Sequence, residues 1–434
     1  MRIAIIALGS RGDVQPYLAL GRGLNQAGHT VRLVTNKNYG PLVQSHGLDF
    51  WPLYGDIQAI VKSPEMQAQL EKGSFIAVMR YALKAAQEAA LHWGREGLEA
   101  CRGMDMLMAG LGGLFLGTAL AEKLDLPLLQ AHYVPFTPTG DFPGALFPPA
   151  VAKLGGVANR LSHHLTRQML WQQSRPADMP MRQQVLGLPP APFFGPFNAQ
   201  PLQGLPILYG FSPSVITRPT DWGEDIHITG YWLMDSETEL AWTPPPAVEE
   251  FLQKGTPPIY IGFGSMSTRK PEETAQLILQ ALAQTGQRAI LISGWSGLQT
   301  SHLSENVLVV DSIPHDWLFR HVAAVVHHGG AGTTSAGLRA GVPSIVIPFF
   351  ADQPFWGQRV ADLGVGPQPI PRQRLTAERL AQAIHHVVTD TAMRQRAAEL
   401  GAKIQAEDGV ARAVELVHQY DQKRVTSASA TLSN

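Results

Sequence analysis

Cysteine and net charge are both scarce in this sequence. Cys101 is the only cysteine among 434 residues, so no internal disulfide can form and a reducing compartment is favoured. It stands at the end of a helical pattern, which we interpret as a structural position rather than that of a nucleophile. The formal net charge is −1, and the missing basic excess argues against a nucleic-acid-binding protein.

Long apolar runs are missing as well. No uncharged apolar stretch approaches the roughly 18 residues that a membrane-spanning helix needs. Met1 leads directly into an apolar strand pattern, without the charged and cleavable segments of a signal peptide. We therefore expect a soluble, cytoplasmic protein without a transmembrane segment, whose apolar loops leave room for peripheral contact with a membrane. The sequence does not indicate an oligomeric state.

The dinucleotide-binding fingerprint G-x-G-x-x-G is also absent. Gly9, Gly12, Gly21 and Gly23 surround the first predicted turn but do not have the required spacing. A nicotinamide-dependent dehydrogenase is thereby disfavoured.

What the sequence does contain is a two-domain α/β pattern. The chain is about two to three times as long as a typical domain. Residues 2–8 are continuously apolar, as in a parallel strand that is buried on both faces. A helical pattern from Val14 to Leu24 and a second strand at 31–35 follow, which predicts a doubly wound sheet.

Both halves of the chain show this alternation. In the first half we predict strands at 48–53, 104–109, 128–131 and 206–211, the last closing the sheet, and helices at 75–98 and 114–124. In the second half we predict strands at 259–263, 288–293, 306–310, 323–327 and 344–348, a helix at 271–284 and three helical patterns between 355 and 423. The predicted parts are an N-terminal domain (1–220), an interdomain linker (221–258), a C-terminal domain (259–408), a final helix (409–424) and a frayed tail (425–434).

The stretch that begins at His327 and His328 is the most informative about chemistry. The next residues, Gly329 to Thr334, are small and stand just ahead of a helical pattern. Open backbone N–H groups and the helix dipole favour an anion at such a position. A histidine and two threonines add donors for phosphate oxygens. We therefore predict a diphosphate site.

Asp352 and Gln353 follow the next predicted strand. Since parallel strands end at one edge of the sheet, the fold should bring this pair to the edge that carries the glycine loop. A carboxylate beside an amide suits the vicinal hydroxyls of a sugar. A diphosphate and a sugar together indicate a nucleotide-sugar.

Several motifs resemble one known family. They are GSRGDVQP near the start, FTPTGDFP in the middle, FGSM at the head of the second half, PHDWLF, and the glycine loop itself. The chain resembles UDP-dependent glycosyltransferases of the GT-B fold, most of all sterol glucosyltransferases and related bacterial enzymes that act on small molecules. The resemblance implies two Rossmann-like domains facing a central cleft, with the final helix returning to the N-terminal domain. It implies no cofactor and no metal, and a nucleotide-sugar, UDP-glucose, as donor.

Asp13 is the candidate general base. It stands at the first strand-to-helix turn, at the carboxyl edge of the sheet, where α/β proteins place ligands. The resemblance assigns an Asp at this turn that role, although an Asp at a helix start is also an ordinary cap. Ser10 could bond to this acid or to the acceptor hydroxyl, or simply form the turn. No second acid that would orient Asp13 is evident in the sequence.

The donor residues follow from the same resemblance. For the diphosphate they are His327, Gly330, Ala331, Gly332, Thr333 and Ser265. Asp352 and Gln353 are expected to contact the sugar. For the nucleobase they are Ile313, Pro314 and His315, with Trp295 as a possible stacking partner in place of the Trp that plant members carry at the position of Ser312.

The acceptor is expected along a Pro- and Phe-rich segment, residues 133–149. Such a segment can be neither a helix nor a central strand, and exposed phenylalanines in it need an apolar cover. The predicted acceptor residues are Phe136, Phe142, Phe147 and His132, and residues 188–201 could extend the wall. Packing of the loop on its own domain is the alternative for each phenylalanine.

The sequence therefore predicts an inverting glucosyltransferase that uses UDP-glucose and a sterol-like or other lipophilic polycyclic acceptor. One alternative is an enzyme for antibiotic, macrolide or flavonoid aglycones that uses UDP- or dTDP-sugars. A second is a nucleotide-sugar epimerase or hydrolase of the same fold. We expect the paired histidines His163–His164 and His385–His386 to lie on helical surfaces.

Overall fold

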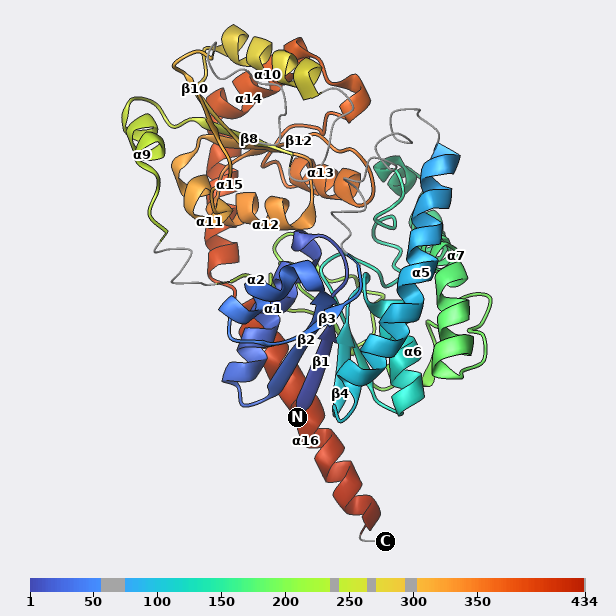
Figure 1. The fold of residues 1–434 in the computed structure, drawn as a ribbon. Helices are drawn as coiled ribbons and strands as arrows, with labels where there is room; N and C mark the ends of the chain where they lie inside the picture. Colours follow the sequence, from blue (N-terminus) through green and yellow to red (C-terminus); the bar gives the residue numbers. More distant parts are fainter. Residues whose placement is uncertain (56–74, 235–241, 264–270, 293–302, 433–434) are drawn as a thin grey trace. The chain divides into compact units, whose positions relative to one another are not determined.

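A computed structural model describes residues 1–55, 75–234, 242–263, 271–292 and 303–432. The chain divides into two compact units. The first unit contains Met1–Gly144, Ala152–Met234 and Asp408–Asn434, and the second contains Ala145–Val151 and Asp235–Glu407. Each unit has a sheet with helices packed against it (Figure 1), and both are Rossmann-like, as the sequence predicted.

The sheet of the first unit is entirely parallel, with the order β3-β2-β1-β4-β5-β6-β7. Its strands are β1 (Arg2–Ile6), β2 (Thr30–Asn36), β3 (Asp49–Leu53), β4 (Met106–Ala109), β5 (Leu128–His132), β6 (Ile207–Tyr209) and β7 (Ile226–Ile228). Its helices are α1 (Arg11–Gln26), α2 (Gly40–Ser45), α5 (Phe75–Cys101), α6 (Leu114–Leu124), α7 (Gly156–Pro180) and α16 (Gly409–Leu432). A π-helix (Met181–Leu186) and short 3-10 turns at Lys37–Tyr39, Pro149–Leu154 and Gln200–Leu202 complete it.

Two apolar cores cover the two faces of this sheet. On one face, α1 and α16 pack against the sheet, with Leu416 and Val417 among the buried residues of α16. On the other face, α5 and α6 contribute the core that also contains Cys101 and Phe136. Strands that are buried on both sides need apolar residues at successive positions, which explains the unbroken run of β1. Cys101 ends α5, and burial raises the pKa of its thiol to about 12, in agreement with a structural role.

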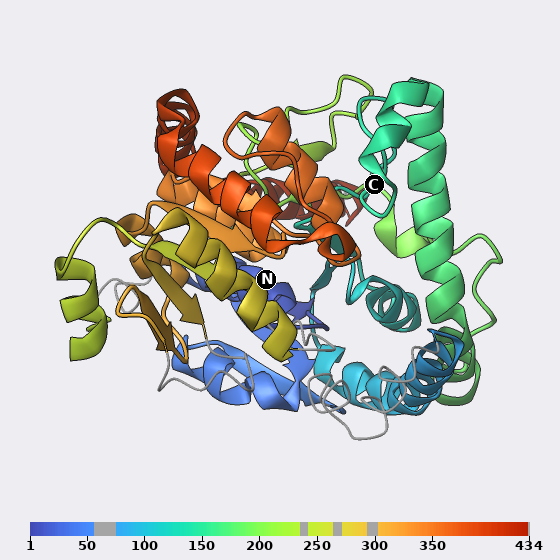
Figure 2. The same ribbon diagram turned by 90° about the horizontal axis from the view of Figure 1, so that it is seen from above.

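The sheet of the second unit has the order β10-β9-β8-β11-β12, again all parallel. Its strands are β8 (Ile259–Gly262), β9 (Ala289–Ile292), β10 (Val307–Val310), β11 (Ala324–His327) and β12 (Ser344–Val346). Its helices are α9 (Pro246–Gln253), α10 (Pro271–Thr285), α11 (His315–Leu318), α12 (Ala331–Ala340), α13 (Gln353–Asp362), α14 (Ala377–Thr389) and α15 (Thr391–Gln405), with 3-10 turns at Phe319–His321 and Arg372–Arg374. Figure 2 shows α10 and α14 over one face of this sheet.

The structure corrects four expectations. The strand at 206–211 is not the last of its sheet, because β7 pairs with β6 and the first unit extends to Met234 rather than 220. Residues 246–253 of the predicted linker form α9, whose Val248 and Phe251 are buried in the second unit. Four helices rather than three follow residue 352, because α14 and α15 are separated only by Asp390, which caps α15. Finally, α16 continues to Leu432, beyond the start of the expected frayed tail.

The final helix packs as the resemblance implied. Ala413, Leu416 and Val417 lie in the core of the first unit beside α1. Within the described parts of the chain, no helix is long and apolar enough to cross a membrane.

Candidate functional site

The turn after β1 holds the Asp13 carboxylate in a fixed position. Ser10 is the N-cap of α1, and its backbone N–H donates to Asp13 Oδ2 in the manner of a capping box. The Ser10 hydroxyl donates to the same oxygen at 2.7 Å. The capping geometry that was the alternative for Asp13 is therefore present, together with the contact predicted for Ser10. The carboxylate is half-buried.

Tyr133 completes the surroundings of Asp13, and the sequence reasoning missed it. Its hydroxyl donates a hydrogen bond to Asp13 Oδ1. An ionised carboxylate has about four acceptor positions, of which Ser10 and Tyr133 fill three. Among the described residues, one position thus remains for a further donor such as an alcohol. Tyr133 directly follows β5, and its place at a carboxyl strand end is the signal that could have identified it.

Gly9 makes this arrangement possible. Its φ of +144° lies in a region that side chains rarely adopt, and a Cβ there would stand 2.3 Å from Asp13 Oδ2. Tyr17, one turn further along α1, donates a hydrogen bond from its hydroxyl to the Ala131 carbonyl at 2.7 Å. Burial, and secondarily the charge of Asp13, raise the pKa of Tyr17, which therefore stays protonated.

The predicted acceptor residue Phe136 is not exposed. Only 3% of its surface is accessible, and its ring packs between His132, Phe197 and the guanidinium of Arg167. His132 is equally buried, and burial lowers its pKa to about 3, so the ring is neutral. Contact of these two side chains with an acceptor stays a prediction, and neither is exposed in the structure. Packing of the loop on its own domain, the alternative interpretation, holds for Phe136.

A set of hydrogen bonds fastens the segment 136–144 to the first unit. The Tyr209 hydroxyl accepts from the amides of Phe136 and Thr137 at 3.1 and 2.7 Å. The carboxylate of Asp221 accepts from the Thr139 hydroxyl at 2.7 Å, from the Gly140 amide at 2.8 Å and from Arg160 at 2.6 Å. These bonds make the segment an ordered wall rather than a free loop.

His163 contributes to the same anchoring. It is 1% exposed, and its Nε2 lies 3.0 Å from the Phe142 carbonyl, so the expectation that it is a surface residue is wrong. Its neighbour His164 is exposed, as are His385 and His386. Phe142 and Phe147 are half-buried, and Phe147 falls within the second unit. Their contact with an acceptor remains a prediction.

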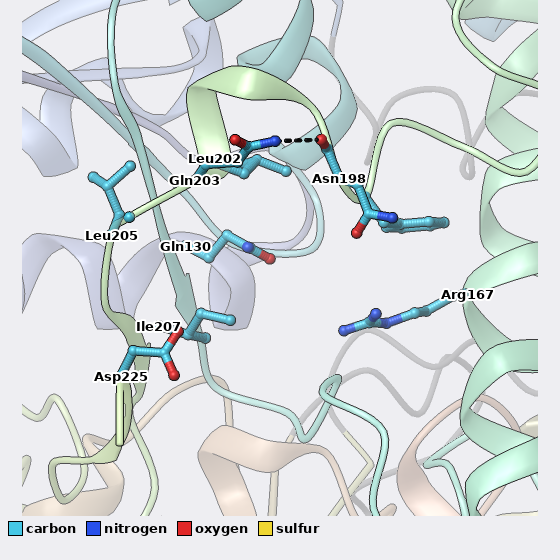
Figure 3. Close-up of a pocket in the computed structure, with 10 residues that line it drawn as sticks. Gln130, Arg167, Asn198, Leu202, Gln203, Leu205, Ile207 and Asp225 are labelled. Carbon is cyan, nitrogen blue, oxygen red and sulfur yellow. Dashed lines mark hydrogen bonds between the residues drawn. The ribbon is translucent and has the colours of Figure 1, made fainter. Parts of the chain in front are cut away.

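A pocket of about 440 Å³ lies on the α6 and α7 side of the first sheet. Figure 3 shows the Arg167 side chain reaching into it from α7. The residues that line it are Gln130, Arg167, Phe197, Asn198, Leu202, Gln203, Gly204, Leu205, Ile207 and Asp225. Residues 188–201 thus line a pocket through Phe197 and Asn198. None of the four predicted acceptor residues is part of this lining.

In the second unit, the start of α12 presents open amides. Gly330 is the N-cap and provides no side-chain cap. The first intrahelical bond at this end runs from Thr334 N to Gly330 O, at 2.9 Å. The amides of Ala331, Gly332 and Thr333 belong to the first turn and so have no partner inside the helix. Gly332 is exposed, with no atom near the position of a Cβ. This helix start can accept an anion.

His327 ends β11 beside this turn and is completely buried. Its Nδ1 accepts from the Gly329 amide at 3.0 Å, so a neutral ring carries its proton on Nε2. Nε2 has no hydrogen-bond partner among the described residues. Burial, and then the neighbouring His328 and His315, hold the pKa of His327 well below its ordinary value. Burial likewise lowers the pKa of His328 to about 4. Both rings are therefore neutral donors at physiological pH.

Asp352 and Gln353 follow β12, and Gln353 lies close to the glycine loop. A Cβ on Gly329 would lie 3.0 Å from the Gln353 carbonyl oxygen, which shows how closely the two approach. The side-chain Oε1 of Gln353 accepts from the amides of Phe349 and Phe350 at 2.8 and 3.3 Å and shapes the loop. Asp352 occupies the N-cap position of α13 without capping it, and its Oδ2 accepts from the Trp356 indole at 2.8 Å. Ala351 has a strained positive φ of 56°.

The predicted nucleobase segment follows β10. Ile313 is buried in the core, and His315 Nε2 lies 2.9 Å from the Tyr260 hydroxyl. The His315 ring stacks on Phe319 at 4.6 Å, so this side chain is engaged inward. Any base contact in this segment would therefore fall to its backbone. Ser265 and Trp295 lie outside the described residues.

The fold and the helix start described above define a glycosyltransferase of the GT-B class. Residues 3–143 match the N-terminal domain of glycosyltransferase family 28, and residues 275–418 match the C-terminal domain of the erythromycin biosynthesis protein CIII-like family. Among solved structures, the glycosyltransferase of kitacinnamycin has a TM-score of 0.65 at 19% identity and covers 96% of this chain and 98% of its own. The calicheamicin glycosyltransferase CalG4 has a TM-score of 0.62 at 20% identity, with 97% and 98% covered.

Named relatives are more similar in sequence. A sterol 3-beta-glucosyltransferase of Arabidopsis thaliana is 36% identical over 97% of this chain and 68% of its own length. One from Cryptococcus neoformans is 35% identical over 96% of this chain but only 27% of its own length. The chain belongs to the glycosyltransferase family that contains these sterol 3-beta-glucosyltransferases.

The Asp221 anchor predicts an acid-sensitive contribution to stability. Burial raises the pKa of Asp221, but the bonds from Arg160, Thr139 and the Gly140 amide outweigh it and lower the pKa to about 2. A carboxyl with a lowered pKa stabilises the fold above its ordinary pKa of 3.8, and this contribution disappears as the pH falls through about 2. Asp221→Asn should lower the urea midpoint of the first unit at neutral pH, and the difference from wild type should vanish near pH 2.

Asp141→Asn is the matched control, because Asp141 is exposed and its carboxylate forms no hydrogen bond to the other described residues of the segment. It should leave the urea midpoint unchanged at every pH. A deficit of Asp221→Asn that stays constant down to pH 2 would contradict the assigned role of the charge.

Proposed function

We propose that this glycosyltransferase transfers glucose from UDP-glucose to a hydroxyl of a sterol or a similar lipophilic polycyclic acceptor, with inversion at the anomeric carbon. The observation that carries the proposal is the 36% identity, over 97% of this chain, to a protein named sterol 3-beta-glucosyltransferase. The solved structures of antibiotic glycosyltransferases are 16 to 20% identical and bear on the fold alone. The antibiotic, flavonoid and epimerase alternatives therefore have less support.

The donor diphosphate would bind at the start of α12. Backbone amides from Gly330 to Thr333 point along the positive end of the helix dipole, which favours phosphate oxygens. The Nε2–H of His327 supports this assignment, since a buried donor without a partner costs about 1 to 3 kcal/mol unless a ligand or water satisfies it. Amides and a neutral imidazole, with Ser265 as a further predicted donor, would stabilise the leaving UDP without a metal.

The glucose would be held by Asp352 and Gln353. Gln353 lies against Gly329, so the two predicted parts of the donor site are adjacent. The Trp356 indole donates to Asp352 Oδ2 and so helps to orient the carboxylate that would accept from sugar hydroxyls. The uracil would be read by the backbone of the segment at Ile313 and Pro314, with Trp295 as a predicted stacking partner.

Asp13 would act as the general base. The acceptor hydroxyl would donate to the remaining acceptor position of its carboxylate and lose its proton to Asp13 as the oxygen attacks the anomeric carbon. Ser10 and Tyr133 orient the carboxylate and thus take the place of the second acid that the sequence lacks. Capping and catalysis are compatible here, because the capping bond occupies only Oδ2.

The direct test is incubation of the full chain with UDP-glucose and, separately, with a sterol panel and a flavonoid panel. We expect a mass increase of one hexose on a sterol. Release of UDP in the absence of any acceptor would favour the hydrolase alternative instead. Transfer to flavonoids alone, or transfer from dTDP-glucose in preference to UDP-glucose, would overturn the proposed substrates.

Asp13→Asn should lower kcat by about 10²- to 10⁴-fold, the usual contribution of a general base. UDP affinity, measured by calorimetry, should remain nearly unchanged because the donors proposed for the diphosphate are residues of the second unit, whereas Asp13 belongs to the first. Tyr133→Phe is the matched variant: it removes one orienting bond but keeps the base, so its loss should be smaller. Turnover of Asp13→Asn within a few-fold of wild type would eliminate the assignment.

Asp352→Ala should weaken the use of UDP-glucose far more than the binding of UDP. The reason is that the carboxylate would contact the sugar and not the diphosphate. The KM for UDP-glucose and the Kd for UDP, measured side by side, test this expectation. Equal losses in both constants would show that Asp352 shapes the loop without touching the sugar.

A further inference from the structure

Most exposed large apolar side chains of this protein gather in one place. Among the residues whose side chains the structure describes, two such residues, Tyr54 and Phe350, lie elsewhere. The others lie on α7, just before it, or on one adjacent loop, and each exposes 43% to 87% of its surface: Leu154, Val157, Leu161, Leu165, Met169, Phe193 and Phe194. We call this set the α7 apolar face.

The four members on α7 recur at every fourth position, from Val157 to Met169. Residues four apart on a helix are neighbours on its surface, so they form a continuous stripe. The inner side of the helix, with Ser162, His163 and Trp171, is buried. Helix α7 packs along α5 and lies at the outer edge of the first unit in both views (Figure 1 and Figure 2). The outer side of the helix is thus apolar and its buried side largely polar, whereas a helix at a water-exposed surface normally has a polar outer face.

The loop with Phe193 and Phe194 is fixed next to this stripe. The Phe193 carbonyl accepts hydrogen bonds from the Trp171 indole at 3.0 Å and from the Gln172 amide at 2.8 Å. The guanidinium of Arg175 lies over the Phe193 ring, 5.1 Å from its centre. The two aromatic rings are therefore held in place beside the helix rather than collapsed onto the core.

Basic residues outnumber acidic ones in the segment that carries this face. Residues 142–220 contain six Lys and Arg but a single acid, Asp178, although the whole chain has a net charge of −1. Asp178 is itself buried. Lys153 is exposed beside the stripe, and Arg160 pairs with Asp221 at its border. Burial, and then Arg167 and Arg160, lower the pKa of the exposed His164, so its ring is neutral. An exposed apolar stripe with Lys153 beside it, and with the single acid of residues 142–220 buried, is complementary to a membrane surface with anionic lipids.

We propose that the α7 apolar face docks the protein onto bilayers that contain anionic phospholipids. The apolar side chains would enter the boundary between headgroups and acyl chains, while Lys153 remains among the phosphates. Apolar insertion and electrostatic attraction together provide the two signals that stable peripheral binding requires. A protein partner with acidic groups opposite the same positive charge is the alternative. The experiment below distinguishes such a partner from a lipid surface. The inference does not rest on the proposed function, since it concerns neither donor nor acceptor.

The test is co-sedimentation of the full chain with vesicles that contain no sterol and no nucleotide-sugar. Vesicles of phosphatidylcholine with about 30% phosphatidylserine should bind the protein more tightly than phosphatidylcholine alone, and salt should weaken this binding. The triple variant Leu161→Gln, Leu165→Gln, Met169→Gln should bind at least about tenfold more weakly. Lys153→Gln should lower the affinity about fivefold.

Tyr54→Gln is the control, because it removes an exposed aromatic side chain of the first unit outside the α7 apolar face. It should bind vesicles like the wild type. All substituted side chains are exposed, so unchanged circular dichroism and thermal unfolding are expected throughout. Wild-type binding by the triple variant, or no preference for anionic vesicles, would overturn the proposal. A wild-type dimer that the triple variant converts to monomers, without vesicle binding by either, would show that a second copy covers this face.

Discussion

The hydrogen bonds around Asp13 are the constraint that ties the turn after β1 to the segment after β5. They join the turn after β1 to Tyr133, the residue that follows β5, so two strand ends that are far apart in sequence share one carboxylate. Gly9 admits this carboxylate because any side chain there would occupy its place. From Tyr133 onward, Tyr209, Asp221 and His163 fasten the segment to the strands and to α7. The Asp13 carboxylate and the segment 136–144 thus belong to one connected network of hydrogen bonds.

The sequence predicted the sheets well because their strands are buried on both faces and therefore read as unbroken apolar runs. The helix α7 escaped prediction for the opposite reason: its apolar stripe faces outward, its buried side is largely polar, and it contains Pro176, a residue that helix interiors disfavour. The strand β7 escaped because three residues are too few to show a period. The predicted and observed helix boundaries differ where a single capping residue, Asp390, separates α14 from α15.

Within the candidate site, the sequence predicted the local structure, namely the turn at Asp13 and the helix start after the glycine loop. The glycine loop, the helix start and the turn at Asp13 can each be read from fewer than ten consecutive residues. Prediction failed where a side chain depends on distant partners, as Tyr133 does on a residue 120 positions away. Phe136 illustrates the same limit. A Pro-rich segment suggested exposure, but Arg167 and Tyr209 turn that part of the chain inward, so its ring joins the core.

The two neutral histidines of the second unit bear on how an anion would be held there. Residues 327–334 contain no Lys or Arg, and burial keeps the rings of His327 and His328 uncharged. The positive electrostatic potential at this helix start therefore comes from amide and imidazole N–H dipoles. Its effect on an anion falls off within about one turn of the helix end. Such a site stabilises an anion whose oxygens each accept a hydrogen bond from one of these donors. It stabilises a charge that lies nearby without such bonds only weakly. Selectivity for a bound phosphate group would then come from the fixed geometry of Gly329, Gly330 and the first turn of α12, which the approach of Gln353 to Gly329 helps to maintain.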